Sequence, residues 1–270
     1  MRVTTLFDDG TRQWLFFGRD PERPASVIDT NEYVVRHDGK ALLLDPGGTE
    51  VFPEVAEAMA RQFDLGEIEA IFGSHQDPDI LSSLPLWIGL RPDVRVYVPW
   101  LWQGFLSHFA IEAQFVAVPD EGGPLPLNGS RDLQMVPAHY VHSSGMFSVY
   151  DPRARLLFSA DVGAALLPAD DDRVFVEDFD AHVGHMEAFH RRWMPSNRAK
   201  NAWIRRVRRL DVDLMCPQHG AIFRGDDVTR FLDWFEALEV GIAAEVGLDE
   251  TPPAERATVA PPAQRATVPR

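Results

Sequence analysis

The sequence has 270 residues, of which 45% are hydrophobic, so it can form one large folded domain or two small ones with a real core. The formal net charge of −15 argues against a general nucleic-acid-binding protein, which needs a basic surface for its phosphate contacts. The single cysteine, Cys216, excludes a disulfide framework, an iron–sulfur cluster and an all-thiolate zinc site.

The two ends of the chain carry different signals. The N-terminal stretch lacks the basic-then-apolar pattern of a signal peptide, and no apolar run is long enough to cross a bilayer, so we expect no membrane contact and a cytoplasmic location. Near the other end, PPAERATVA is followed at once by PPAQRATVPR, a Pro-, Ala- and Thr-rich duplication that cannot form a packed core. We therefore expect one domain over residues 1–250 and a disordered tail over residues 251–270.

The first part of the chain predicts a hairpin, a helix and a further strand. Residues 32–48 contain two apolar runs around Asp38-Gly39, which is a hairpin signal. Within residues 51–63, apolar residues recur at every fourth position on one helical face. Residues 68–74 form a short apolar strand, and the loop after it contains His, Asp and Pro in close succession.

The later elements continue this mixture. Pro78 keeps Asp77 extended, and Asp79 suits the N-cap of a helix that reaches about residue 90. The remaining expected elements are strands over residues 94–99, 115–119 and 133–142, a helix over 100–110, a hairpin over 145–161 that turns at Asp151-Pro152, a strand over 214–220 and an amphipathic helix over 226–246. Strands that interleave with helices but also form hairpins favour two mixed sheets flanked by helices, an αββα sandwich, over a doubly wound parallel sheet.

Potential metal ligands follow several of these predicted strands. The six residues are His75, Asp77, Asp79, His142, Asp161 and His219. Rigid scaffolds commonly position functional side chains in loops just beyond strand ends. Like carboxylates at alternate positions repel one another unless a positive charge lies between them. Three imidazoles and three carboxylates gathered at one edge would supply ligands for two metal ions, and one carboxylate that reached both ions would be the natural bridge.

Five motifs in chain order carry a resemblance to a known family: LLLDPGG, HQDPD, HSSG, FSADVG and CPQHG. Over residues 30–223 the chain resembles the metallo-β-lactamase superfamily, and within it the diiron branch of flavo-diiron proteins and related oxygen-binding diiron proteins. The resemblance implies the αββα metallo-β-lactamase sandwich and two iron ions. It also implies the ligand assignment: His75, Asp77 and His142 on one ion, Asp79 and His219 on the other, and Asp161 as the bridge.

The loop of residues 75–80 departs from the patterns of both branches. The zinc hydrolases of the superfamily carry HxHxDH, so Asp77 and Ile80 stand here where those enzymes have histidine. A more anionic ligand set favours harder ions over zinc, although zinc and manganese remain alternatives to iron. The diiron branch carries HxExD, so Asp77 is one methylene shorter than the glutamate of that pattern. Ile80 lowers the ligand count and leaves room for an exogenous ligand such as O2.

The resemblance implies a protein that binds O2 or reduces O2 or NO at two ferrous ions. Electrons would come from a separate donor, because this chain ends before a flavodoxin domain could fit, and we expect no FMN in it. An oxygen sensor or carrier without turnover shares the same site. The alternative from another class is a dinuclear zinc hydrolase, in which metal-activated water attacks an ester, thioester or phosphodiester.

Five other polar residues near the motifs have an expected role outside the ligand set or more than one interpretation. Asp45 is expected to turn the chain and to hydrogen-bond near the metal loop. His139 either contacts a metal ligand from behind and orients it, or is a half-buried strand residue. We expect His182, His185 and His190 not to be ligands, because the family site is complete without them.

Basic residues concentrate in the segment of residues 191–209. On a helix, Arg205, Arg206, Arg208 and Arg209 would share one broad face. This face is either solvated and balanced by nearby acids or a docking surface for an acidic electron-transfer protein. RNA is the least favoured partner because the whole chain is acidic.

Overall fold

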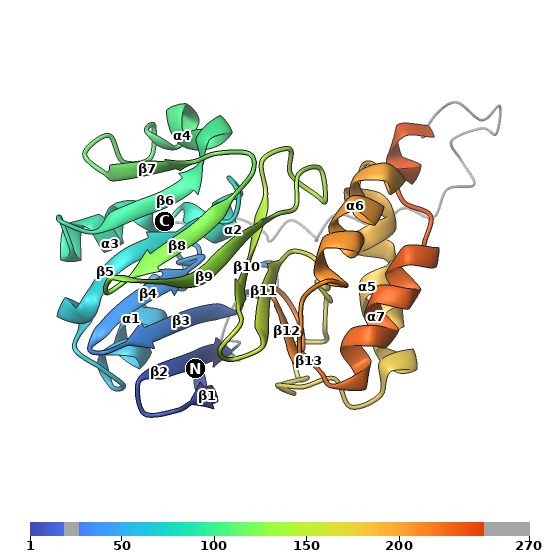
Figure 1. Ribbon diagram of the computed structural model, residues 1–270, viewed down its shortest axis with the longest axis horizontal. Helices are drawn as coiled ribbons and strands as arrows, with labels where there is room; N and C mark the ends of the chain where they lie inside the picture. Colours follow the sequence, from blue (N-terminus) through green and yellow to red (C-terminus); the bar gives the residue numbers. More distant parts are fainter. Residues whose placement is uncertain (19–26, 246–270) are drawn as a thin grey trace, which may run out of the picture.

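The computed structural model describes residues 1–18 and 27–245, so the predicted tail over residues 251–270 lies outside the described residues. Two mixed β-sheets pack face to face, and helices cover their outer faces (Figure 1). This arrangement confirms the αββα sandwich that the sequence predicts. No helix within the described ranges is long and apolar enough to cross a membrane.

The first sheet contains seven strands in chain order. They are β1 (Arg2–Asp8), β2 (Arg12–Gly18), β3 (Glu32–His37), β4 (Lys40–Leu44), β5 (Ile68–Phe72), β6 (Arg95–Pro99) and β7 (Gln114–Val118). The β3–β4 hairpin turns at Asp38-Gly39 as predicted, and both residues have positive φ. Strands β4 to β7 are parallel, so their carboxyl ends lie at one edge of the sheet.

The second sheet contains six strands in the order β13-β12-β11-β10-β9-β8. They are β8 (Gly123–Leu127), β9 (Ser130–Pro137), β10 (Phe147–Asp151), β11 (Leu156–Ala160), β12 (Leu214–Pro217) and β13 (Phe223–Arg224). Strands β10 and β11 form the predicted hairpin. Strands β11 and β12 are parallel, so the loops that carry Asp161 and His219 leave the sheet at the same edge.

Helices form the two outer layers, with α1 to α4 beside the first sheet and α5 to α7 beside the second (Figure 1). They are α1 (Phe52–Ala60), α2 (Pro78–Leu81), α3 (Leu84–Leu90), α4 (Trp100–Leu106), α5 (Phe179–Trp193), α6 (Asn197–Val207) and α7 (Asp226–Ala237), with short 3₁₀ turns η1 (Leu65–Glu67) and η2 (Ile242–Glu245).

Two predicted helices have different bounds in the structure. The helix expected from Asp79 onward is split into α2 and α3, and Asp77 holds the N-cap position because Pro78 occupies the first turn. The helix expected over residues 226–246 ends at Ala237, because Leu238 is extended and Gly241 has a positive φ of 87°.

Alternate residues of the first sheet face two apolar cores. On β4, Leu42 and Leu44 lie in the core between the sheets, whereas Ala41 and Leu43 lie in the core beneath the helices of the first layer. Because both faces of this strand are buried, the strand is a continuous apolar run rather than an alternating one. The cores hold the strands rigidly and so fix the loops at their carboxyl ends.

Candidate metal centre

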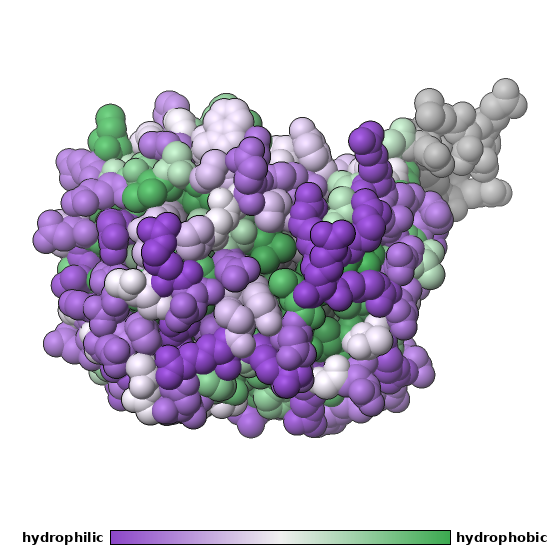
Figure 2. Space-filling view, viewed as in Figure 1, coloured by the Kyte–Doolittle hydropathy of each residue, from purple (hydrophilic) through white to green (hydrophobic). Residues whose placement is uncertain are grey.

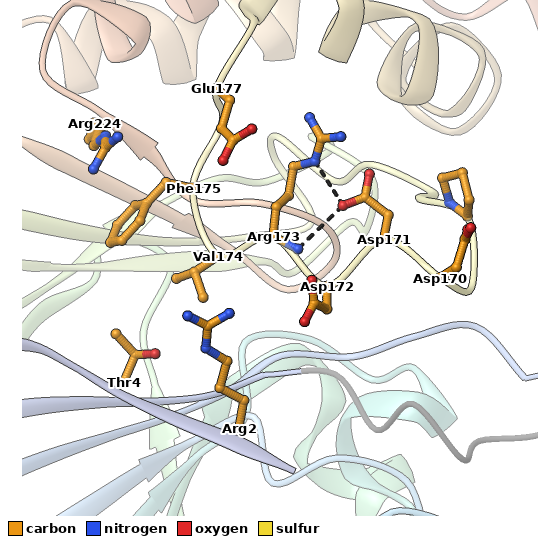
Figure 3. A pocket seen from close by; sticks show the side chains of 11 residues that line it. Arg2, Thr4, Asp170, Asp171, Asp172, Arg173, Val174, Phe175, Glu177 and Arg224 are labelled. Carbon is orange, nitrogen blue, oxygen red and sulfur yellow. Dashed lines mark hydrogen bonds and ion pairs between the residues drawn. The ribbon is translucent and has the colours of Figure 1, made fainter.

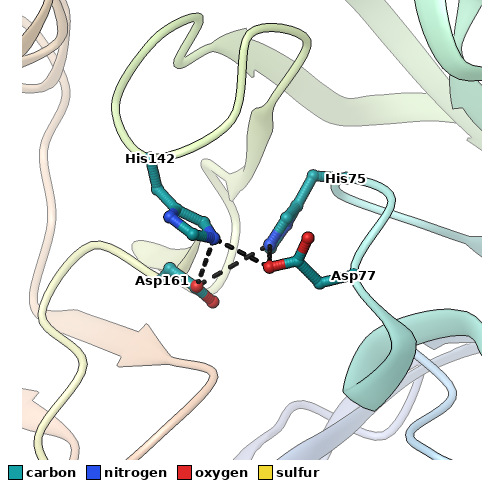
Figure 4. A group of neighbouring side chains, drawn as sticks. All are labelled: His75, Asp77, His142 and Asp161. Carbon is teal, nitrogen blue, oxygen red and sulfur yellow. Dashed lines mark hydrogen bonds and ion pairs between the residues drawn. The ribbon is translucent and has the colours of Figure 1, made fainter. Parts of the chain in front are cut away.

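Four of the predicted ligands converge at the edge where these loops meet (Figure 4). We call His75, Asp77, His142 and Asp161 the first cluster; their ligand atoms all lie within 4.8 Å of one another. His142 Nε2 lies 2.8 Å from Asp77 Oδ2 and 3.3 Å from Asp161 Oδ2. His75 Nε2 lies 3.5 Å and 3.7 Å from the same two oxygens. Atoms that share one ion at about 2.0–2.3 Å must stand roughly this far apart, so the cluster has the size of a metal site.

The other two predicted ligands lie beside the second oxygen of Asp161. His219 Nε2 is 3.5 Å from Asp79 Oδ2 and 3.7 Å from Asp161 Oδ1. Asp161 therefore turns one carboxylate oxygen toward the first cluster and the other toward His219. The structure brings all six predicted residues together, with Asp161 between the two groups.

The buried donor atoms of these residues fit a cation. His75 Nε2 and Asp161 Oδ1 are buried and have no hydrogen-bond partner among the described residues. Buried polar atoms are nearly always paired, so an unpaired atom in each of the two groups indicates a missing positive partner in each. Imidazole and carboxylate are also the donors that first-row metal ions accept. The residues present therefore fit the two metal ions that the family resemblance implies.

The electrostatics of the metal-free side chains lead to the same conclusion. Burial opposes a charge on His75, but the carboxylates of Asp161 and Asp77 outweigh it and raise the pKa of His75 to about 9. Burial also opposes ionisation of Asp77, but hydrogen bonds from His142 and His75 lower its pKa far below the ordinary value. Burial raises the pKa of Asp79; His219 acts against this rise, and Asp161 adds to it. A proton on His75 can balance part of the negative charge that a metal ion would otherwise balance.

Asp45 reaches the site through an intervening serine. It is fully buried and accepts hydrogen bonds from Ser74 N (2.7 Å) and Ser74 Oγ (2.6 Å), and that Oγ lies 2.9 Å from His75 Nδ1. Burial raises the pKa of Asp45 to about 7, although His75 and Ser74 act against this rise. The Asp45–Ser74 pair holds His75 with Nε2 turned to the cluster, as groups behind a metal ligand usually do.

The comparisons with known proteins agree with this geometry. A family described as ODP family beta lactamase matches residues 28–220. The chain belongs to this family. Its structure superposes on the apo state of the chemotaxis sensor ODP from T. denticola with a TM-score of 0.82 and 36% identity, over 92% of this chain and 99% of that one. It matches the structure described as the peroxy diiron species of chemotaxis sensor ODP with a TM-score of 0.80 and 34% identity, over 92% and 100% of the two chains.

A curated relative extends the likeness to the flavin-containing proteins of the branch. Diflavin flavoprotein A 1 from Synechocystis sp. is 24% identical over 212 residues, which cover 77% of this chain. The chain spans 36% and 52% of the lengths of two curated relatives that it matches. These matches confirm the diiron branch of the metallo-β-lactamase superfamily that the motifs predict.

The opening to the ODP-family site is mainly apolar. A cavity of about 290 Å³ is lined by Val27, Ile28, Asp77, Pro78, Asp79, His142, Asp161, Phe189, Trp193 and His219. Phe189 stacks on Trp193 with ring centroids 5.9 Å apart, and the Trp193 ring is 5.5 Å from that of His142. The lining includes no lysine or arginine among the described residues.

A second cavity of about 620 Å³ lies between β1 and the loop before α5 (Figure 3). Its walls carry Arg2 and Arg224 as well as acidic side chains, and Arg173 donates to Asp171 at 2.7 Å. Among the described residues, it shares no lining residue with the first cavity and contains neither His nor Cys. The metal chemistry therefore belongs to the smaller, apolar cavity.

Two histidine predictions can be placed in the structure. His139 Nε2 lies 2.8 Å from the carbonyl oxygen of Asp120, its ring packs on Phe147, and no described hydrogen bond or ion pair joins it to the six residues. His182, His185 and His190 lie outside the first cluster.

His190 supports the site in a way that sequence reasoning missed. It is fully buried; its Nδ1 donates to Met186 O at 2.7 Å, and its Nε2 accepts from Gly163 N at 3.0 Å. Burial lowers its pKa to about 4, so it is neutral at pH 7 and can accept that bond. Gly163 belongs to the turn after Asp161, so His190 steadies the turn that carries Asp161.

Proposed function

We propose that the chain is a non-haem diiron protein that binds O2, and that it reduces O2 or NO when a separate donor supplies electrons. The observation that carries this proposal is the placement of Asp161, whose two oxygens face different histidines. The first cluster would hold one iron ion, and Asp79 and His219 would hold the other. Two ferrous ions, when bound, would supply reversible electron transfer to a small ligand.

The donor set supports iron more than zinc. Three carboxylates and three imidazoles make a harder, more anionic set than the histidine-rich loop of the zinc hydrolases. Zinc and manganese remain the alternative metals. The similarity to a chemotaxis sensor described as a peroxy diiron species supports iron, and it favours an oxygen sensor over an enzyme with turnover.

The unequal donor counts support binding of an external ligand at the second ion. Four side chains surround the first position, but Asp79, His219 and the shared Asp161 surround the second. Ile80 supplies no donor there, because its side chain is fully buried in the apolar core beneath the helices of the first layer. Reactive metal sites keep such a position open.

The cavity distinguishes the diiron proposal from the hydrolase alternative. Its apolar rim of Ile28, Phe189 and Trp193 suits a small neutral molecule. The substrates of a phosphodiesterase carry negative charge, which the carboxylates of the site would repel and for which the described lining residues offer no lysine or arginine. These features favour O2 or NO over an anionic ester.

Metal analysis combined with optical spectroscopy tests the proposal. The full chain is loaded with Fe²⁺ without oxygen and then exposed to air. We expect two iron ions per chain and a visible absorption band that grows on exposure. Colourless protein that retains two zinc ions and cleaves a generic phosphodiester or ester would establish the hydrolase instead.

Asp77→His is expected to shift the metal preference toward zinc, because it restores the second histidine of the HxHxD loop. The zinc-to-iron ratio bound in competition should rise by about tenfold or more, which corresponds to roughly 1.4 kcal/mol. Asp77→Glu is the matched control, since it creates the HxExD loop and should retain iron. An unchanged ratio in Asp77→His would contradict the ligand argument.

The exposed face of α6 is the proposed docking surface for an acidic electron-transfer protein. Arg205 and Arg206 on α6 are exposed, as are Arg208 and Arg209 just after it, but Arg208 is tied to Asp233 and Glu236. Figure 2 shows strongly hydrophilic side chains gathered over α6.

Charge reversal tests this surface. Reduction of the iron-loaded chain by an acidic donor should slow with rising salt and in Arg205→Glu/Arg206→Glu, because steering depends on complementary charge. Reduction rates that stay the same at higher salt and in the double variant would exclude α6 as the docking surface.

A further inference from the structure

We infer that Asn31 is a positioning residue for the second half of the metal centre, an inference that rests on the proposed two-metal function. Asn31 immediately precedes β3, is fully buried and belongs to none of the motifs that carry the ligands. It contacts the loop of residues 217–220, which carries His219. Through this loop it fixes the direction of His219 Nε2.

Asn31 satisfies most of the carbonyl groups of that loop. Its Nδ2 donates to the carbonyl oxygens of Pro217 (3.0 Å) and Gly220 (2.9 Å). Its backbone N–H donates to the carbonyl oxygen of Gln218 at 2.7 Å. A single buried residue thus pairs three of the four carbonyls around His219, and buried carbonyls need such partners.

The same segment sets the tautomer of the imidazole. His219 Nδ1 donates to the backbone carbonyl of Asp29, so the neutral ring has its lone pair on Nε2. That nitrogen faces Asp79 and Asp161. A carbonyl behind a ligand histidine orients the ring. Residues 29–31 therefore set both the tautomer of His219 and the place of its loop.

Tight packing leaves the loop few ways to recover lost bonds. Gly220 has a positive φ of 85°, and a Cβ there would lie 2.7 Å from the Cβ of Ala165 and 2.8 Å from its carbonyl oxygen. The loop thus packs closely on the turn that follows Asp161. Without the Asn31 side chain, the carbonyls of Pro217 and Gly220 would each lose this donor inside the protein.

Of the first cluster, His75, Asp77 and His142 have no described hydrogen bond to this segment. Ser74 and Asp45 hold His75, and His142 contacts Asp77. Loss of the Asn31 donors should therefore weaken binding of the second metal ion and spare the first. A general loss of stability would weaken both ions together, so this difference identifies a positioning role.

Asn31→Leu tests the inference, because it preserves the branched shape and removes both side-chain donors. The metal-free full chain is titrated with Co²⁺ and followed by calorimetry and visible absorption. We expect two binding steps in the unmodified chain; in Asn31→Leu we expect an unchanged first step and a second step weakened roughly 10–100-fold. His219→Ala removes the ligand itself and should lose the second step, so it serves as the reference for a missing second site. Tyr33→Phe is the matched control, because it removes a further donor to Pro217 O, at 2.9 Å, and leaves the Asn31 donors in place.

The outcomes separate this inference from the proposed function. Fewer than two Co²⁺ ions in the unmodified chain would contradict the two-metal function itself. Two unchanged steps in Asn31→Leu, equal weakening of both steps, or the same selective loss in Tyr33→Phe would overturn the role of Asn31. If Asn31→Leu does not fold, the Zn²⁺-loaded unmodified chain decides by NMR: slow exchange of the Asn31 amide protons supports the role, and exchange at the rate of a free amide overturns it.

Discussion

Asp161→Asn is expected to abolish binding of a metal pair, which is the largest single effect that the site predicts. The replacement preserves size and shape, but an amide nitrogen cannot ligate a metal ion, so one of the two faces of residue 161 is lost. In the structure Oδ2 faces His75 and His142, and Oδ1 faces His219. Metal content after anaerobic loading with Fe²⁺ should fall from two ions per chain to at most one.

The thermal stability of the same variant provides an independent measurement. A metal ion that binds the folded chain at about 100 times its Kd stabilises it by about 2.7 kcal/mol. Asp161→Asn should lose most of this metal-dependent rise in Tm. Asp170→Asn, an exposed carboxylate outside the site, is the control and should retain both ions and the full rise. Two tightly held ions in Asp161→Asn would show that residue 161 is not the bridge.

The six clustered residues could be predicted because each follows a strand-like run within a short motif. The parallel pairing of β11 with β12 brings Asp161 and His219 to one edge, although 58 positions separate them. The αββα sandwich was predictable for a similar reason. Apolar runs such as β4 are long enough to be recognised as strands from the sequence. The Asp38-Gly39 turn identifies the β3–β4 hairpin from adjacent residues alone.

The residues that support the ligands could not be found in this way. Asn31 contacts a loop 186 to 189 positions away, and His190 contacts Gly163 across 27 positions. No periodicity or spacing links such pairs; only the folded topology does. His139 shows the opposite case. It lies three positions before His142 in the chain, yet its described hydrogen bond goes to the carbonyl oxygen of Asp120 and not to His142.

Helix ends were predictable only where local chemistry decides them. Asp79 resembles an N-cap residue, yet α2 begins at Pro78, two residues earlier than an Asp79 cap would give, and Asp79 faces His219. The amphipathic pattern beyond residue 237 continues, but Leu238 is extended, and its carbonyl accepts a hydrogen bond from the buried Lys200 ammonium at 2.6 Å. That contact joins two helices and has no local signal.

Glu32→Gln is expected to make the protein more stable in alkaline solution and to flatten its dependence on pH. Glu32 is fully buried beside the Asn31 segment; Thr30 Oγ1 donates to its Oε1 at 2.7 Å, and its Oε2 has no hydrogen-bond partner among the described residues. Burial raises its pKa to about 8; the hydrogen bond from Thr30 opposes this rise, and the charges of Glu50 and Asp45 add to it.

The direction of the effect follows from proton linkage. Between about pH 4.5 and pH 8 the folded chain retains a proton on Glu32 that the unfolded chain has released, so the free energy of unfolding falls as the pH rises through this window. The slope from this group approaches about 1.4 kcal/mol per pH unit. Glutamine cannot ionise, so the variant should lose this slope and exceed the unmodified chain by a few kcal/mol near pH 8. Denaturant unfolding of both metal-free proteins from pH 5 to pH 8.5 measures the difference, with exposed Glu54→Gln as control. If the free energies of unfolding of the two proteins followed parallel curves against pH, Glu32 would ionise in the folded chain with its ordinary pKa.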